Sequence, residues 1–150
     1  MKKCLIIIIL IFSLTTNGYC FQNEPNGFFN MKWSSPVSEL KKMYNSVRLL
    51  KDGDIQWYVP NSGFVKFSGA MTRVTYQYLK GELFFVNIYF EKEDINTLKN
   101  ALKISYGEPT KSADGIFFWE GEVTSISLDS KNSLISFWST KIMSRSKKSK

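Results

Sequence analysis

The sequence predicts an α+β fold in which two helices pack on antiparallel β-meander sheets, in the order helix, strands, helix, strands. Two stretches carry apolar residues at helical spacing, and each is followed by short runs of β-branched and aromatic residues between turn clusters. Helices segregated in this way from antiparallel strands are typical of a two-layer domain. The plan of a helix followed by a meander occurs twice, which is compatible with an internal duplication, although too few identical residues link the halves to argue for one.

The first helix is expected to begin after Ser34. Ser35 can cap the free backbone N–H groups, and Pro36 suits the first helical position because proline has no N–H to leave unpaired. An apolar stripe along one helical face is formed by Val37, Leu40, Tyr44 and Val47.

Strands are predicted at 55–59, 64–68, 73–79 and 83–90. The last two are expected to form a hairpin around Lys80-Gly81. A three-residue turn with Gly81 in the left-handed conformation would gather the most apolar surface on one face, so we expect this bulged turn rather than a two-residue loop. That face would carry Val74, Tyr76, Tyr78, Phe84, Val86, Ile88 and Phe90.

The second helix is expected between Asp94, which can cap it, and Gly107, which can end it in a left-handed conformation. Pro109 prevents the helix from resuming. Its apolar face is formed by Ile95, Leu98 and Leu102, with Ala101 beside them. Further strands are predicted at 116–119, 123–128 and 134–138.

The first twenty residues predict a secretory signal. Lys2 and Lys3 precede an apolar run over 5–12, and the small-residue cleavage site Gly18-Tyr19-Cys20 follows. The run is too short to cross a bilayer core of about 30 Å. We therefore expect residues 1–20 to be removed, and a single domain over 21–140 to lie in the periplasm or to be secreted.

Cys20 has an alternative role as the lipid-bearing first residue of an anchored lipoprotein. That processing prefers a small residue before the cysteine and leucine three positions before it, whereas Tyr19 and Asn17 stand there. The unanchored form is therefore favoured over a lipid anchor at Cys20. If cleavage follows Cys20, the mature chain has no thiol, and its fold depends on packing rather than on disulfides.

The net charge of +7 does not predict a nucleic-acid binder, because the excess lies at the two ends of the chain. Residues 21–140 contain thirteen basic and thirteen acidic residues. Binding to nucleic acid needs a basic surface that persists on the fold. We expect 141–150 to be a basic disordered tail, which offers the only possible contact with a membrane.

The composition excludes several chemistries. The chain contains no histidine, which rules out Ser-His-Asp and Cys-His catalysis and histidine-based zinc sites. Ser38 and Lys41 match the Ser-x-x-Lys nucleophile motif, but the partner motifs are absent and an exposed helical turn explains both residues. The clustered carboxylates fit turns and a helix start. We expect neither a metal nor a cofactor.

Aromatic residues supply the sequence evidence for a binding surface. Both faces of 83–90 are apolar, and helices are expected to cover only one face of the sheet. Exposed aromatic patches mark surfaces for partners or ligands, although loops or the N-terminal segment could cover the second face instead. The candidate binding residues on that face are Trp57, Phe85, Tyr89 and Trp138.

Residues 21–28, Phe-Gln-Asn-Glu-Pro-Asn-Gly-Phe, and the following Met31-Lys32-Trp33-Ser34-Ser35 resemble a group of uncharacterised small exported bacterial proteins. Their mature chains begin with Asn-Glu-Pro-x-Gly-Phe, followed by Ile-Lys-Trp-Gly-Thr. Further matches cover most of the mature chain, at 74–76, 84–90, 98–107 and 118–119. Ser34 replaces the usual glycine, which puts a tight turn before the first helix in doubt. The resemblance implies export and a shared fold, but no activity and no catalytic residues.

These observations favour an exported binding or accessory module over an enzyme, with another exported protein or a small apolar ligand as its partner. One alternative is a small hydrolase that works without histidine, through carboxylates or a Ser-Lys pair. Another is an inhibitor of a further exported protein, because β-lactamase inhibitor proteins share the helix-plus-meander plan. Analogy of fold does not by itself fix function.

Overall fold

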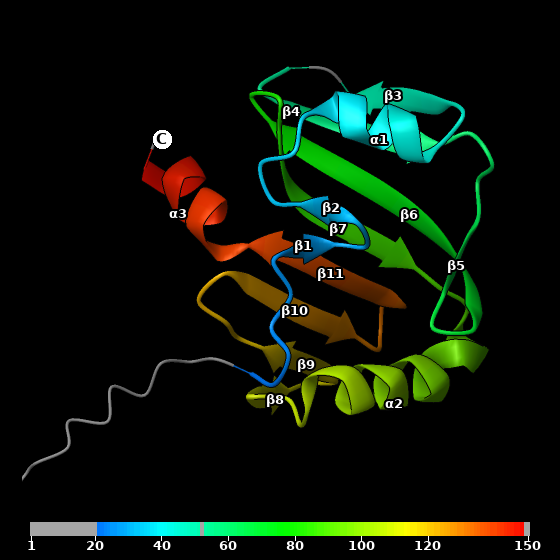
Figure 1. Cartoon of the computed structure of the whole chain (residues 1–150). Coiled ribbons are helices and arrows are strands. Elements are labelled where there is room, and N and C mark those ends of the chain that lie inside the picture. The colour runs from blue at the N-terminus through cyan, green and yellow to red at the C-terminus, as the bar shows by residue number, and fades with distance from the viewer. Residues whose placement is uncertain (1–20, 52, 149–150) are drawn as a thin grey trace, which may run out of the picture.

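The computed structural model describes residues 21–51 and 53–148 (Figure 1). Most of the strands form one nine-stranded antiparallel sheet, in the order β3-β4-β6-β7-β11-β10-β9-β8, with β5 paired to β6. Their bounds are β3 (Val47–Lys51), β4 (Ile55–Pro60), β5 (Val65–Phe67), β6 (Ala70–Leu79), β7 (Glu82–Tyr89), β8 (Lys111–Ala113), β9 (Ile116–Trp119), β10 (Thr124–Asp129) and β11 (Leu134–Ser139). The predicted α+β class is confirmed, while the number and order of the helices differ in detail.

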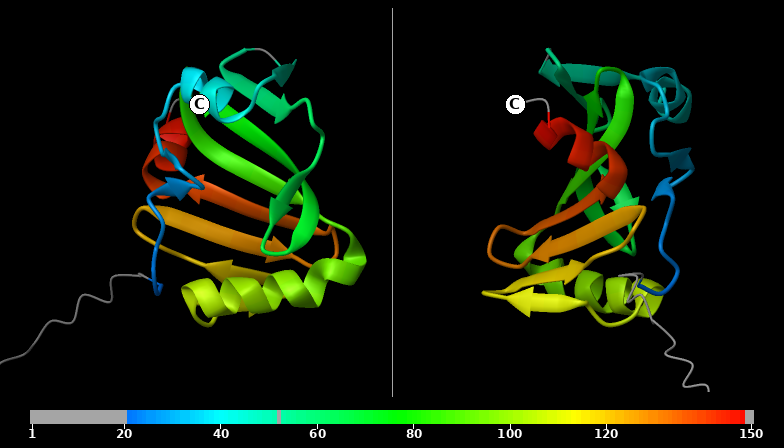
Figure 2. Two further views of the ribbon diagram at one scale, coloured as in Figure 1. Left: turned by 45° about the vertical axis from the view of Figure 1, so that its right-hand side comes forward. Right: turned by 90° about the vertical axis from the view of Figure 1, so that its left-hand side faces the viewer.

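The remaining elements are a short hairpin and the helices. They are β1 (Gly27–Phe28), β2 (Met31–Lys32), α1 (Val37–Met43), the 3-10 turn η1 (Lys92–Asp94), α2 (Ile95–Tyr106) and α3 (Thr140–Lys148). The β1–β2 hairpin, α1 and α2 all lie over the same face of the large sheet (Figures 1 and 2). Their aromatic contacts agree with this, because Phe28, Tyr44 and Tyr106 meet Tyr76 or Phe137 on that face.

The core follows from the strand register. Directly paired residues share a face of the sheet, so one row of side chains crosses six strands beneath the helices. The row is Tyr58, Tyr76, Val86, Phe137, Ile126 and Trp119. All six side chains are buried, and this row forms the centre of the single apolar core that the described residues build.

The sheet consists of two halves that meet at β7 and β11. The first half is α1 followed by β3, β4, β6 and β7, and the second is α2 followed by β8, β9, β10 and β11. In space the second set of strands runs in the reverse order, so that β7 and β11 are central neighbours. Ser136 Oγ donates a hydrogen bond of 2.7 Å to Asn87 Oδ1 across this seam.

The first helix is shorter than its apolar stripe predicts. α1 ends at Met43, Tyr44 is already extended, and Val47 belongs to β3, where it pairs with Pro60. Ser35 does not cap the helix with its side chain. Its backbone carbonyl instead accepts a hydrogen bond from the N–H of Leu83, which ties the helix start to the sheet.

Ser34 keeps the tight turn that its replacement of glycine put in doubt. The residue adopts a φ of 68°, in the left-handed region that glycine favours. Its N–H donates a hydrogen bond of 2.9 Å to the carbonyl of Leu83, which holds the turn against β7.

The predicted three-residue turn between β6 and β7 is wrong. Leu79 pairs with Glu82, so the loop contains only Lys80 and Gly81, both at positive φ (49° and 85°) as in the turns that close two-residue hairpins. The register then shifts between Gln77 and Tyr78, at a bulge in β7.

This bulge restores most of the predicted face. Val74 and Tyr76 lie opposite Ile88 and Val86, as expected, whereas Tyr78 pairs with Leu83 rather than lying beside Phe84. A two-residue turn followed by one extra residue therefore gives the same side-chain parity as a three-residue turn.

Where the structure describes the C-terminal region, up to residue 148, it is a helix and not the disordered tail expected over 141–150. Residues 140–148 form α3, whose Ile142 is buried, and the N–H of Thr140 donates a hydrogen bond of 3.0 Å to the carbonyl of Val123. The predicted signal at 1–20, with Cys20, lies outside the described residues. No helix among the described residues is long and apolar enough to cross a membrane.

Candidate functional site

In the part of the chain that the structure describes, α1, α2 and the β1–β2 hairpin lie over one face of the large sheet, and beside the other face only α3 is drawn, where it projects from the end of β11 (Figure 2). We call this other face the open face and define it by Trp57, Phe85, Tyr89 and Trp138. Residues on this face alternate along each strand with the core residues, because successive side chains of a strand point to opposite faces.

The structure brings three of the four predicted binding residues into one row. Trp57 pairs with Gln77, Gln77 with Phe85, and Phe85 with Trp138. The rings of Phe85 and Trp138 are stacked, with centroids 5.9 Å apart and an interplanar angle of 13°. All three aromatic side chains of the row are half-buried.

Tyr89 lies on the same face, four residues along β7 from Phe85. It pairs with Arg73 on β6 and with Leu134 on β11, and its side chain is 38% exposed. On this face of β7, Asn87 therefore separates Tyr89 from the aromatic row.

A strip of neutral polar side chains lies between and beside these aromatics. Asn87 stands between Phe85 and Tyr89 on β7, and it pairs with Thr75 and Ser136 on the neighbouring strands. The buried polar residues of the strip are Thr75, Gln77, Asn87, Ser125 and Ser136. Within the described residues, Thr75 Oγ1 and Trp57 Nε1 are buried without a hydrogen-bond partner. The centre of the open face is thus aromatic and uncharged.

The titratable groups of the described residues lie mostly at the surface. Every acidic residue of the described chain is at least partly exposed, and no group of three potential metal ligands occurs there. Hydrogen bonds from the Asn132 side chain, and from backbone N–H groups at 131 and 132, lower the pKa of Asp129 and hold a turn. Ser38 and Lys41, the Ser-x-x-Lys match, are exposed on α1.

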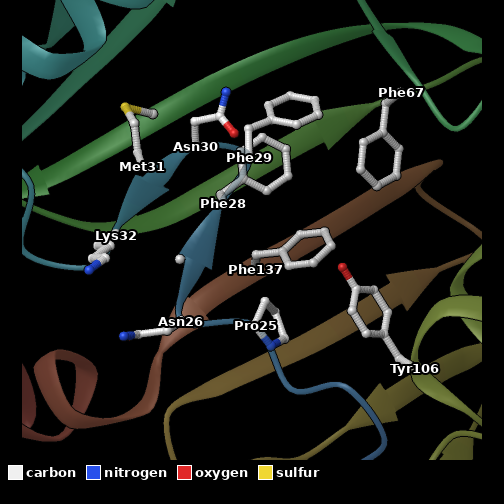
Figure 3. A pocket seen from close by; sticks show the side chains of 11 residues that line it. Pro25, Asn26, Phe28, Phe29, Asn30, Met31, Lys32, Phe67, Tyr106 and Phe137 are labelled. Atoms are coloured by element: carbon white, nitrogen blue, oxygen red, sulfur yellow. The ribbon is translucent and has the colours of Figure 1, made fainter.

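A second candidate site, which is concave, lies on the opposite face of the sheet, beside the β1–β2 hairpin. This aromatic cavity has a volume of about 470 Å³. It is lined by Pro25, Asn26, Gly27, Phe28, Phe29, Asn30, Met31, Lys32, Phe67, Tyr106 and Phe137 (Figure 3). Burial raises the pKa of Tyr106, so this ring contributes a neutral hydroxyl to the wall.

Sequence reasoning did not identify this cavity. Its aromatic wall comes from four separate elements, β1, β5, α2 and β11, whose proximity depends on the tertiary fold. The available signal was the pair Phe28-Phe29 in a segment otherwise rich in Gly, Pro and Asn.

Comparison with known proteins identifies the family of the chain. A family model described as the TP0088 domain matches residues 27–149, which include every strand and helix described above. No curated protein and no solved structure matches the chain. Because the family model covers most of the sequence, the chain belongs to the TP0088 domain family.

Proposed function

We propose that this protein is an exported binding or accessory module that captures another exported protein on its open face. The observation that carries the proposal is the uncovered row of Trp57, Phe85 and Trp138, with Tyr89 on the same face. Aromatic residues are enriched at the centres of protein interfaces, while charged residues are depleted there. The stacked pair of Phe85 and Trp138 follows this pattern, while charged groups lie beside the other two aromatics: Arg73 pairs with Tyr89, and Lys51 Nζ lies 5.6 Å from the Trp57 ring.

Export rests on the sequence of residues 1–20, which has a basic start, an apolar run and a small-residue cleavage site. The resemblance of residues 21–35 to small exported bacterial proteins supports the same location. In this proposal the protein works in the periplasm or outside the cell after cleavage near Cys20, without a cofactor.

A direct test is a cross-linked pull-down of the tagged mature chain from the periplasm of its own host. We expect one stoichiometric partner with the native protein and its loss with the double variant Phe85→Ser/Tyr89→Ser. Tyr89→Ser alone tests the exposed position without disturbing the half-buried one. The matched control is Ile104→Ser, because Ile104 on α2 is 81% exposed and lies outside the open face.

The stability of the variants separates binding from folding. Circular dichroism of both open-face variants should remain native-like. In urea, Tyr89→Ser should stay close to the native protein, whereas the double variant should lose part of its stability but remain folded, because Phe85 is half-buried and packs against the core. If Tyr89→Ser unfolds the domain, the residue is a core residue and the proposal is wrong. Retention of the partner by the folded double variant would also contradict it.

Inhibition of an exported enzyme is a second candidate for the same surface. The observation that favours it is the repeated plan of a helix and a four-stranded meander in one sheet, which resembles the plan of β-lactamase inhibitor proteins. In this case the captured partner would be an enzyme, and adding the purified protein would reduce its activity at stoichiometric amounts. Capture without any loss of activity would leave the accessory function as the better description.

A further inference from the structure

The aromatic cavity has walls that are formed by the fold itself. Phe28 of β1 lies 5.1 Å from Phe137 of β11 and 6.0 Å from Phe67 of β5, measured between ring centroids. Tyr106 of α2 lies 6.2 Å from Phe137. Because Phe28, Phe67 and Phe137 belong to the buried core, these rings keep their positions without a ligand. The volume of about 470 Å³ lies in the range of sites for small molecules, about 300–1,000 Å³.

The two ends of the cavity differ in polarity. Asn26 and Lys32 lie at one side, whereas Phe67 and Tyr106 lie at the other (Figure 3). Lys32 carries the only charge among the lining side chains, since burial keeps Tyr106 neutral. Its ammonium group forms no ion pair with any acidic side chain in residues 21–51 and 53–148. This arrangement is complementary to a ligand with an apolar body and one anionic end.

Phe29 occupies an unfavourable conformation at the mouth of the cavity. It has a φ of 50°, in the first position of the two-residue turn between β1 and β2, where glycine is favoured. Its side chain is 50% exposed, yet its ring lies 4.4 Å from that of Phe28 and 6.2 Å from that of Phe67. Residues held in sparsely populated conformations cluster at ligand clamps and similar functional sites.

We propose that the aromatic cavity binds a small amphipathic carboxylate, whose apolar body lies against the accessible rings of Phe29 and Tyr106 and whose carboxylate pairs with Lys32. The ring of Phe29 covers the apolar body, and this contact shields the part of the ring that is exposed without ligand. Medium-chain fatty acids and aromatic carboxylates share this chemistry. The site is separate from the open face, because it lies under the hairpin on the opposite side of the sheet.

Calorimetric titration of the mature chain with dodecanoate, 2-naphthoate and dodecylamine tests the proposal. The native protein should bind one carboxylate per chain more tightly than the amine. Lys32→Glu should weaken carboxylate binding about tenfold, because the charge at the polar end changes sign. The variant should then bind the amine more tightly than the carboxylates. Tighter binding of dodecanoate identifies an acyl ligand and tighter binding of 2-naphthoate an aromatic one. Binding of neither carboxylate, or an unchanged preference in Lys32→Glu, overturns the proposal.

Two further variants distinguish binding in the cavity from effects of net charge and of protein stability. Lys41→Glu changes the net charge equally, but Lys41 lies on α1 outside the cavity lining, so carboxylate affinity should not change. Phe29→Gly should weaken binding severalfold while thermal stability is kept or raised, because glycine tolerates the positive φ. A purely structural role of Phe29 would leave the affinity unchanged, which would contradict its role as a cover.

Discussion

At the scale of single residues, Glu24 joins the N-terminal segment to the second half of the sheet. Its Oε1 accepts hydrogen bonds of 2.6 Å from the backbone N–H groups of both Val123 and Thr124. Gly121 lies against the same carboxylate, and a Cβ at this position would collide with Glu24 Oε1 and with the carbonyl of Thr124. The absence of a side chain at 121 therefore permits a contact between residues about one hundred positions apart.

Gly121→Ala should lower the free energy of unfolding by about 1–3 kcal/mol, the usual cost of an overpacked site. Urea denaturation followed by tryptophan fluorescence measures the change. The double variant Gly121→Ala/Glu24→Ala serves as the control, because one partner of the collision is then missing and the two costs should not add. Native-like stability of Gly121→Ala would show that the backbone yields without cost.

At the scale of elements, α3 is a docked helix rather than a free end. It begins directly after β11, and the N–H of Ile142 donates a hydrogen bond of 3.3 Å to Ser139 Oγ. The Ile142 side chain is only 2% exposed and lines a hollow with Trp33 and Val123. Ile142, with the partly buried Met143 beside it, therefore anchors an element whose other residues are mostly polar.

Ile142→Ala should destabilise the protein by about 2–5 kcal/mol, because it removes a buried aliphatic side chain and leaves a cavity. Ile104→Ala is the matched control on α2, where the same side chain is 81% exposed, and its effect should stay within about 0.5 kcal/mol. Thermal unfolding monitored by circular dichroism compares the two. Equal effects of both substitutions would mean that α3 does not contribute to the core.

Local patterns predict some of these elements well and others poorly. The strand at 116–119 coincides with β9, and Gly107 ends α2 as expected, although its φ of 81° and ψ of −169° are not the predicted left-handed helical conformation. The stripe from Val37 to Val47 fails at its end because a β-branched residue can serve a helix face or a strand equally. β8 and α3 carry too few apolar residues to produce a periodic signal, so only tertiary contacts define them.

The two candidate sites also differ in how far local sequence patterns predict them. Strand parity correctly groups Trp57, Phe85, Tyr89 and Trp138 on one face, because alternation along a strand is a local property. The bulge in β7 is invisible to this reasoning, and so is the aromatic cavity. Its rings at 28, 67, 106 and 137 are brought together by strand order, which no local pattern encodes.

At the scale of the whole molecule, the seam between β7 and β11 makes one unit of the two halves. Ile88 pairs with Ile135 across it, and both side chains are completely buried. The core row of each half continues into the other, so the unfolding of one half would expose the core residues of the other half to water. The two meanders should therefore unfold together.

Tryptophan fluorescence and far-UV circular dichroism should give coincident urea transitions, because the four tryptophans are distributed over both halves. Ile88→Ala should move both transitions together to lower urea, with a loss of about 2–5 kcal/mol. Two separate transitions, or a shift seen by only one probe, would show that the halves are independent.

The outermost strands, β3 and β8, have a consequence for concentrated solutions of this protein. Each ends the sheet and leaves a row of backbone groups able to pair with another chain. β3 carries Arg48 and Lys51, and the three-residue β8 begins with Lys111. Two copies that approach through β3 bring Arg48 and Lys51 of both chains together, which opposes growth of the sheet at that edge, whereas Lys111 of β8 is paired with Glu120. Resistance to aggregation is thus placed at the β3 edge of the sheet rather than on the open face.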